Sequence, residues 1–303
     1  MFDLISIGGI SIDLYFKGNS LTYSDDRFQL AIGGKYLADH FYAGVGGGGT
    51  NIAIGAAKHG LKVALMGKIG NNIFKKTILD TLSKHNIFHS LCDIENDYFN
   101  VSAILLSAGG ERSVIHYMTP HQHLFNEINE LKGITKTKMV FLGNLPDVQL
   151  EERSQFLHFL NKKGITTIVN LGVKDCRRSV EQLKRLLQCV DILILNGHEF
   201  AEMVKAPYKD IHFRSNVIDW YIPQLSDKLV VVTEGANGSY AYYKDEIYHQ
   251  SAEPLEKIID STGAGDGFTA AFISQYQKTG DILSSLKIGS VYAAKILCKV
   301  GAN

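Results

Sequence analysis

The segment DSTGAGDGF, residues 260–268, combines glycines at 263, 265 and 267 with two aspartates and leads into an apolar stretch. Glycine permits backbone conformations closed to other residues and lets main-chain amides approach a ligand closely. A helix over residues 268–277 would aim its N-terminal amides and the positive end of its dipole at the same place. The segment therefore predicts an anion site.

Asp266 stands beside this expected anion site, where a bound phosphate would repel it. Its presence makes chemical sense as a general base that accepts a proton from a hydroxyl attacking the phosphate, a role worth about 10² to 10⁴ in rate. The alternative is an ordinary loop in which Asp266 caps the following helix. The segment alone leaves both interpretations open.

Two other nucleotide-binding motifs can be compared with the sequence. The GxxxxGK[ST] pattern of a Walker loop does not occur anywhere in the chain. Gly44, Gly46 and Gly49 match GxGxxG, but the strand expected next ends at Gly67-Lys68 and has no acidic residue to hold a ribose. A nicotinamide-dependent dehydrogenase is therefore poorly supported.

The elements that must position these residues alternate along the chain. Short apolar runs typical of buried parallel strands occupy residues 2–7, 63–66, 139–142, 166–169, 192–195 and 229–232. Amphipathic stretches of helical length lie between them, at 51–59, 73–85, 150–163, 179–187, 200–204 and 218–225. This alternation predicts a parallel sheet with helices on both faces.

Two regions break the alternation. Residues 14–43 form a long connection that is rich in aromatic side chains, and residues 101–106 and 114–117 flank a turn sequence in hairpin fashion. We expect them to form a small second sheet. A connection this long in a compact domain usually acts as a lid or binding element.

Composition limits the class of protein. The chain has 303 residues, 45% of them hydrophobic, and 31 basic side chains balance 31 acidic ones. It should be globular, and nucleic acid is an unfavoured main partner because no net charge attracts it. The first residues lack the basic start of a secretory signal and no apolar run has membrane-spanning length, so we expect a soluble, cytoplasmic protein without a membrane partner.

Metal and disulfide sites are not indicated. The four cysteines are scattered without a CxxC pair, which predicts buried thiols: Cys92, Cys176, Cys189 and Cys298. His116, His121 and His123 lie close in sequence, but they lack a carboxylate or cysteine partner and are expected in a polar loop.

Five motifs in order resemble those of the ribokinase, or PfkB, family of sugar and nucleoside kinases, over nearly the whole chain. The resemblance implies one domain, residues 1–303, built as a three-layer α/β/α sandwich around a mainly parallel sheet, with a β lid from about 14–43 and 97–119. In DSTGAGDGF it implies that Asp266 is the catalytic base and that the amides of Gly263, Ala264 and Gly265 form the anion hole.

Two motifs resemble the family's substrate site. GGISID at 8–13 implies that Asp13 binds sugar hydroxyls, and GGGGTN at 46–51 implies substrate contact by Gly46, Gly47 and Asn51. A carboxylate and an amide can grip neighbouring hydroxyls through paired hydrogen bonds. Asp13 could also end a strand and Asn51 could also cap a helix, without excluding these roles.

Two further motifs resemble the nucleotide side of the site. NGHE at 196–199 is similar to an NxxE motif that helps to place magnesium and phosphate, which implies roles for Asn196 and for Glu199 as metal partner. Magnesium prefers one or two carboxylates plus waters, although a solvated glutamate in a first helical turn is the simpler interpretation. TEGANG at 233–238 resembles the nucleotide-binding loop, and a tight hairpin is its alternative. Its members are Thr233, Gly235 and Gly238.

Three segments depart from the family pattern. Asn71 and Asn72 stand where acidic residues are usual and Lys75 where glycine is common, so the usual substrate contact is in doubt there. VNLG at 169–172 replaces a pattern of several hexose kinases, which weakens a hexose assignment. VGAN at 300–303 stands where ribokinases continue into a monovalent-cation loop, which leaves potassium activation open.

The sequence thus predicts an ATP- and Mg²⁺-dependent kinase that phosphorylates a hydroxyl of a small sugar or sugar-like molecule. A nucleoside kinase on the same fold is one alternative, in which lid aromatics stack on a base. A catalytically silent relative that binds nucleotide or sugar is the other. The resemblance also implies a homodimer formed through the lid. The identity of the substrate is not predicted.

Overall fold

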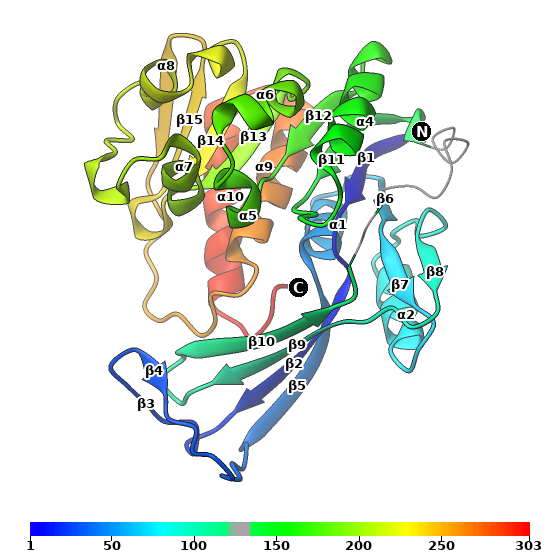
Figure 1. The fold of residues 1–303 in the computed structure, drawn as a ribbon, viewed down its shortest axis with the longest axis vertical. Coiled ribbons are helices and arrows are strands. Elements are labelled where there is room, and N and C mark those ends of the chain that lie inside the picture. The colour runs from blue at the N-terminus through cyan, green and yellow to red at the C-terminus, as the bar shows by residue number, and fades with distance from the viewer. Residues whose placement is uncertain (121–122, 124–133) are drawn as a thin grey trace.

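A computed structural model describes residues 1–120, 123 and 134–303. Its main sheet has eight strands in the order β16-β15-β14-β13-β12-β11-β1-β6 (Figure 1). Six of them are parallel, and the last two along the chain, β15 and β16, are antiparallel. Their bounds are β1 (Phe2–Ile7), β6 (Val63–Met66), β11 (Thr137–Leu142), β12 (Thr166–Val169), β13 (Ile192–Asn196), β14 (Leu229–Thr233), β15 (Ser239–Tyr243) and β16 (Glu246–Gln250).

Side-chain alternation divides the core into two layers, one on each face of the sheet. In β1, Ile5 and Ile7 join one buried cluster while Leu4 joins the other, and Val230 and Val231 of β14 separate in the same way. Because both faces are covered, these strands are apolar throughout. The sequence prediction of a three-layer sandwich around a mainly parallel sheet is confirmed.

Two groups of helices cover the two faces (Figure 1). The cluster that holds Leu4 packs against α1 (Gly48–Lys58), α2 (Lys75–Lys84), α9 (Ala264–Thr279) and α10 (Ile282–Leu297). The other cluster packs against α4 (Leu150–Lys162), α5 (Val173–Cys176), α6 (Val180–Gln188), α7 (Gly197–Val204) and α8 (Val217–Tyr221). Among the described residues, no helix combines the length and the hydropathy that crossing a membrane requires.

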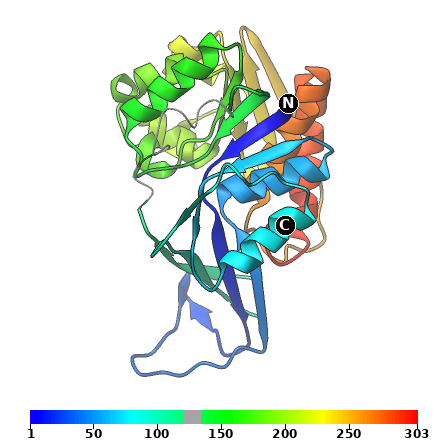
Figure 2. The same cartoon turned by 90° about the vertical axis from the view of Figure 1, so that its right-hand side faces the viewer.

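A second sheet of four strands, in the order β10-β9-β2-β5, stands off the main domain (Figures 1 and 2). It consists of β2 (Ser11–Lys17), β5 (His40–Gly46), β9 (Asn100–Leu106) and β10 (Arg112–Met118). A small hairpin, β3 (Tyr23–Ser24) with β4 (Arg27–Phe28), lies in the β2–β5 connection, and β7 (Lys68–Gly70) pairs with β8 (Asp93–Glu95) elsewhere. The expected small sheet from the two irregular regions is therefore present.

The cysteine prediction is only partly right. Cys176 is buried, and Cys92 and Cys189 are half-buried. Cys298, just after α10, is exposed. An apolar residue type at a helix end can face solvent without cost when no core lies above it.

Candidate active site

Helix α9 begins at Ala264, four residues before the start expected from the sequence. Gly263 is its N-cap, with a φ of 74° that favours glycine, and no side chain caps the helix. Asp266 therefore lies inside the first turn, and the interpretation of Asp266 as a cap is wrong. The first amides of a helix have no partner within it, and at the start of α9 Ala264 N lies 3.5 Å from the Ser261 carbonyl oxygen.

Asp266 meets Asn51 of α1, a residue 215 positions earlier in the chain. Asn51 Nδ2 donates a 2.7 Å hydrogen bond to Asp266 Oδ2. Burial raises the pKa of Asp266 to about 6, although the bond from Asn51 opposes this and the charge of Asp13 adds to it. The carboxyl is thus a stronger base than a free aspartate and still ionises below neutral pH.

The other carboxyl oxygen of Asp266 faces the start of α1. A Cβ added to Gly48 would lie 3.9 Å from Oδ1, so the glycine leaves space in front of this oxygen. Among the residues that the structure describes, none donates a hydrogen bond to Oδ1. One carboxyl oxygen is therefore held by Asn51 while the other is open to a ligand.

Asn51 does not cap α1, contrary to the simpler interpretation of its position. The N-cap is Gly47, and Asn51 lies within the helix, where only 6% of its surface is exposed. Gly46, which precedes it, lies against Asp13, because an added Cβ would overlap the Asp13 carboxylate. The glycine run thus lets the start of α1 approach β2.

Asp13 is the third residue of β2 and does not end the strand. Its side chain is buried, and Ser11 Oγ donates a 3.0 Å hydrogen bond to Oδ1. Burial raises the pKa of Asp13, while a hydrogen bond from Ser102 and the charge of His116 act in the opposite direction. The carboxylate therefore has polar partners on the second sheet.

Ser102 and His116 were not predicted as site residues. Asp13, Ser102 and His116 are register partners on β2, β9 and β10, and their side chains share one face of the second sheet. Ser102 Oγ lies 3.1 Å from His116 Nδ1. The period-2 alternation of the predicted hairpin puts His116 on one face of β10, but only the register with β9 and β2 brings it to the same face as Asp13.

The histidine prediction is corrected by these contacts. His116 belongs to a strand and not to a loop, and His123 Nδ1 lies 3.3 Å from Glu152 Oε2, so it does have a carboxylate neighbour. His121 lies outside the described residues.

The carboxyl ends of β13 and β14 place a second group of predicted residues side by side. Asn196 and Thr233 are register partners at the last positions of these strands. Asn196 and Glu199 form a capping box at the start of α7, with bonds of 2.9 Å from Asn196 N to Glu199 Oε2 and 2.8 Å from Glu199 N to Asn196 Oδ1. Glu199 is thus engaged by the helix start and not freely solvated.

The charge of Asp266, the predicted base, also acts on Glu199. Its pKa is raised by burial and, in addition, by the charge of Asp266, while its bond to the Asn196 amide acts the other way. The two carboxylates are therefore close enough for their charges to interact. Oxygen ligands of this kind suit a hard cation such as magnesium, and the capping box engages only one of the Glu199 oxygens.

The connection from β14 to β15 is a tight turn between antiparallel neighbours, as the simpler interpretation predicted. Gly235 and Gly238 have φ values of 53° and 94°, so both positions favour glycine. A Cβ at Gly238 would overlap the backbone of β16. The turn holds backbone groups close to the carboxyl edge at Thr233.

The departures at Asn71 and Asn72 make local hydrogen bonds. Asn72 Nδ2 donates to the Tyr98 carbonyl at 2.8 Å, and Asn71 Nδ2 donates to Asn96 Oδ1 at 2.9 Å. Lys75 Nζ donates to Asn71 Oδ1 at 3.0 Å. The polar groups of Asn71, Asn72 and Lys75 are thus used in bonds within and between neighbouring loops.

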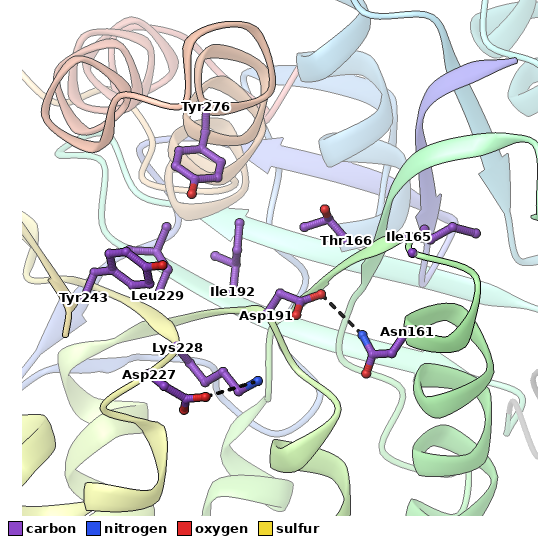
Figure 3. Close-up of a pocket in the computed structure, with 11 residues that line it drawn as sticks. Asn161, Ile165, Thr166, Asp191, Ile192, Asp227, Lys228, Leu229, Tyr243 and Tyr276 are labelled. Carbon is purple, nitrogen blue, oxygen red and sulfur yellow. Dashed lines mark hydrogen bonds and ion pairs between the residues drawn. The ribbon is translucent and has the colours of Figure 1, made fainter.

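A cavity of about 530 Å³ lies at the opposite edge of the main sheet (Figure 3). It is lined at the amino ends of β12, β13 and β14 and includes Asp191, which accepts a 3.3 Å hydrogen bond from Asn161. None of the predicted site residues lines it. The carboxyl edge, where open α/β sheets bind ligands, holds the candidate site instead.

Comparison with known proteins shows the family of the chain. The pfkB family carbohydrate kinase model matches residues 1–303. Relatives include a 5-dehydro-2-deoxygluconokinase of Listeria monocytogenes, 25% identical with 98% of this chain and 90% of the relative covered. A deoxyribokinase of Salmonella typhi is also 25% identical, with 96% and 91% covered.

Solved structures share the fold. Arabidopsis thaliana ribokinase, complexed with ribose and ATP, has a TM-score of 0.80 and 21% identity, with 99% of this chain and 94% of that chain covered. Adenosine kinase from Sinorhizobium meliloti has a TM-score of 0.79 and 18% identity, with 100% and 95% covered. With the family model spanning every residue, the chain belongs to the pfkB family of carbohydrate kinases and is a sugar kinase.

Proposed function

We propose that this kinase transfers the γ-phosphoryl group of ATP to a hydroxyl of a small sugar, with Asp266 as general base. The observation that carries the proposal is that the two carboxyl oxygens of Asp266 have different surroundings. Asn51 holds Oδ2 at 2.7 Å, and Oδ1 faces the space that Gly48 leaves open. A base needs such a fixed carboxylate with one free oxygen within reach of the acceptor.

Oδ1 of Asp266 takes the proton of the acceptor hydroxyl as its oxygen attacks phosphorus. The pKa near 6 keeps the carboxylate ionised at neutral pH and makes it more basic than an ordinary aspartate. The amides of Gly263, Ala264 and Gly265, at the positive end of α9, donate to the oxygens of the transferring group. Positioning and charge stabilisation supply the catalysis.

The acceptor is held on the opposite side by Asp13, whose carboxylate accepts hydrogen bonds from neighbouring hydroxyls. Gly46, Gly47 and Asn51 form the adjoining wall, where glycine keeps the backbone close to the sugar. His116 and Ser102 extend this polar surface across the second sheet. A polyol is thus fixed with one hydroxyl towards Asp266.

ATP lies along the carboxyl ends of β13 and β14, against Asn196, Thr233, Gly235 and Gly238. Glu199 is the proposed partner of Mg²⁺, through the carboxyl oxygen that the capping box leaves free. Bound there, magnesium would neutralise negative charge on the phosphates. An enzyme that consumes ATP works where ATP is supplied, so we place it in the cytoplasm.

We treat residues 1–303 as one domain, with a lid formed by about 14–43 and 97–119. Closure of the second sheet over the sugar would exclude water, which would otherwise compete as phosphoryl acceptor. A substrate-dependent fall in proteolysis of the two lid regions is the expected sign.

The outer face of the second sheet supports the proposal of a homodimer. Phe41, Ile115 and Tyr117 share this face by register and are 58%, 64% and 63% exposed. An apolar patch of this kind favours burial against a second copy. Sedimentation should give a dimer for the wild type and a monomer for Ile115→Lys with Tyr117→Lys. A wild-type monomer would remove the proposal.

A nucleoside acceptor is the second candidate. His40 and Tyr42 lie on the inner face of the second sheet with their rings stacked at 6.3 Å, and such a surface could accept a base. Stronger turnover of nucleosides than of free sugars would select this candidate.

A coupled assay for ADP release over pentoses, hexoses, keto-deoxy sugar acids and nucleosides tests the function. We expect turnover with a sugar or sugar acid, abolished by Asp266→Asn. Absence of ADP release with every acceptor would overturn the proposal.

A further inference from the structure

The segment Gly301–Asn303, which follows α10, runs across the start of α9. Gly301 N donates a 3.0 Å hydrogen bond to Asp260 Oδ2. Ala302 is 7% exposed and fills the space beside Gly263, where a side chain would overlap it. Asn303 then reaches the first helix of the site. These three consecutive residues thus contact both the loop before α9 and the start of α1.

The hydrogen bonds of Asn303 allow only one orientation of its side-chain amide. Its Nδ2 donates to the Val45 carbonyl at 2.9 Å and to Asn51 Oδ1 at 2.9 Å. A backbone carbonyl can only accept a hydrogen bond, so the amide of Asn303 cannot turn without losing both bonds.

The orientation of the Asn303 amide fixes that of the Asn51 amide. An asparagine amide has nearly the same shape after a half-turn, so its orientation depends on its partners. A turned Asn51 would set its own NH₂ group against that of Asn303 and its oxygen against the Asp266 carboxylate. Both new contacts would be repulsive, which leaves the orientation in which Nδ2 donates to Asp266 Oδ2 at 2.7 Å.

We propose that Asn303 is a positioning residue for catalysis, which fixes the amide of Asn51 so that it holds the carboxylate of Asp266. The proposal rests on the assignment of Asp266 as base. The relay runs from the Val45 carbonyl through Asn303 and Asn51 to Asp266 Oδ2, and so keeps Oδ1 aimed at the acceptor.

The relay should also be visible in the titration of Asp266. The bond from Asn51 lowers the pKa of Asp266, so loss of Asn303 should raise it. The other charges that act on Asp266 come from Asp13 of β2 and Glu199 of α7, and neither changes in the variant. Tyr292 of α10, which packs beside Gly267 of α9, has a raised pKa and stays neutral in this range.

The test compares Asn303→Leu, which has a similar shape and no hydrogen-bonding group, with Asn303→Gln, which keeps the donor. Asn216→Leu removes the N-cap of α8 and is the matched control for lost stability. We expect kcat of Asn303→Leu, with the best acceptor of the ADP-release screen, to fall about tenfold with little change in KM for ATP. Asn303→Gln should recover part of the loss.

Two readouts separate positioning from simple destabilisation. The midpoint of the kcat–pH profile should move upward in Asn303→Leu by roughly half a pH unit, so that the loss is greater at pH 6 than at pH 8.5. Carbon-13 NMR titration of the Asp266 carboxyl, which needs no acceptor, should show the same shift.

Two results would overturn the inference. One is an unchanged pKa of Asp266 in Asn303→Leu. The other is a loss of kcat that is uniform with pH and equal to that of Asn216→Leu at matched melting temperature. Retained turnover in Asp266→Asn is a different result, because it would remove the assignment of the base itself.

Discussion

Arg112 of the second sheet is bonded to Thr262, the residue immediately before the N-cap of α9. Its Nη1 donates to Thr262 Oγ1 at 2.6 Å and lies 3.5 Å from Oδ1 of Asp260, whose side chain is fully buried. Asp260 Oδ1 in turn accepts a 2.9 Å bond from Thr262 N. The second sheet and the loop that carries the proposed anion hole therefore share one polar network.

We expect Arg112→Gln to weaken catalysis through this network. Loss of the guanidinium leaves the buried Asp260 without its cationic partner and releases the loop before Gly263. Stability should fall by about 1–2 kcal/mol, because Arg112 is partly exposed and Asp260 keeps its backbone donors. The anion hole should then bind phosphate less well, so kcat should fall more than the KM for sugar rises.

Arg27→Gln is the matched control for Arg112. It removes an exposed guanidinium from β4 and should leave kcat and melting temperature unchanged. Equal kinetics for the two variants would show that the Arg112 contact does not serve catalysis.

Asp266→Asn should lower turnover by at least about a hundredfold while ATP binding and the fold are kept. The amide has the shape of the carboxylate but cannot take a proton from the acceptor. Calorimetric titration with ATP, circular dichroism and the ADP-release assay together check this. Turnover close to the wild-type value would contradict the role of Asp266.

The pKa of Asp266, raised by burial to about 6, predicts the pH dependence of kcat. The base must be ionised, so kcat should rise with pH, pass its midpoint near pH 6 and level off above neutral pH. A profile that is flat between pH 5 and 8, with chemistry rate-limiting, would contradict this assignment.

The same shift has a consequence for stability. A carboxyl whose pKa is higher in the folded than in the unfolded protein binds more protons when folded. Its contribution therefore destabilises the fold as pH rises from about 4, the ordinary aspartate range, to about 6. The wild type should lose melting temperature relative to Asp266→Asn across this window. Parallel curves for the two proteins would show that the raised pKa is absent.

The sequence was sufficient for the parts of the site that depend on local pattern. Apolar runs predicted the six parallel strands, and the carboxyl ends of parallel strands meet at one edge, which brought Asn196 beside Thr233. Asp266 could be named from its glycine-rich surroundings, and Asn51 from the resemblance of GGGGTN to a motif of the family. The start of α9 was misplaced because glycines disfavour a helix locally, whereas here packing against Ala302 and α10 forms the first turn.

Contacts between distant segments were beyond sequence reasoning. Ser102 and His116 join Asp13 only because β2 and β10 flank β9 in one particular register, which a single sequence does not specify. Asn303 and Asn51 are 252 positions apart, and Arg112 and Thr262 are 150 apart. Each pair depends on how complete elements dock, and side-chain type alone carries no signal for it.

Gly46 and Gly44 offer a paired test of the sugar site on the single strand β5. A Cβ at Gly46 would overlap the Asp13 carboxylate, whereas a Cβ at Gly44 meets no atom within 4 Å. Gly46→Ala should therefore push Asp13 out of place and raise the KM for sugar by about tenfold or more, with ATP affinity kept. Gly44→Ala makes the same chemical change without displacing Asp13, so it should keep ATP affinity and raise the KM for sugar much less than Gly46→Ala does. If Asp13 holds the acceptor, the two alanine variants must differ in this way, and equal KM values for sugar would place the acceptor elsewhere.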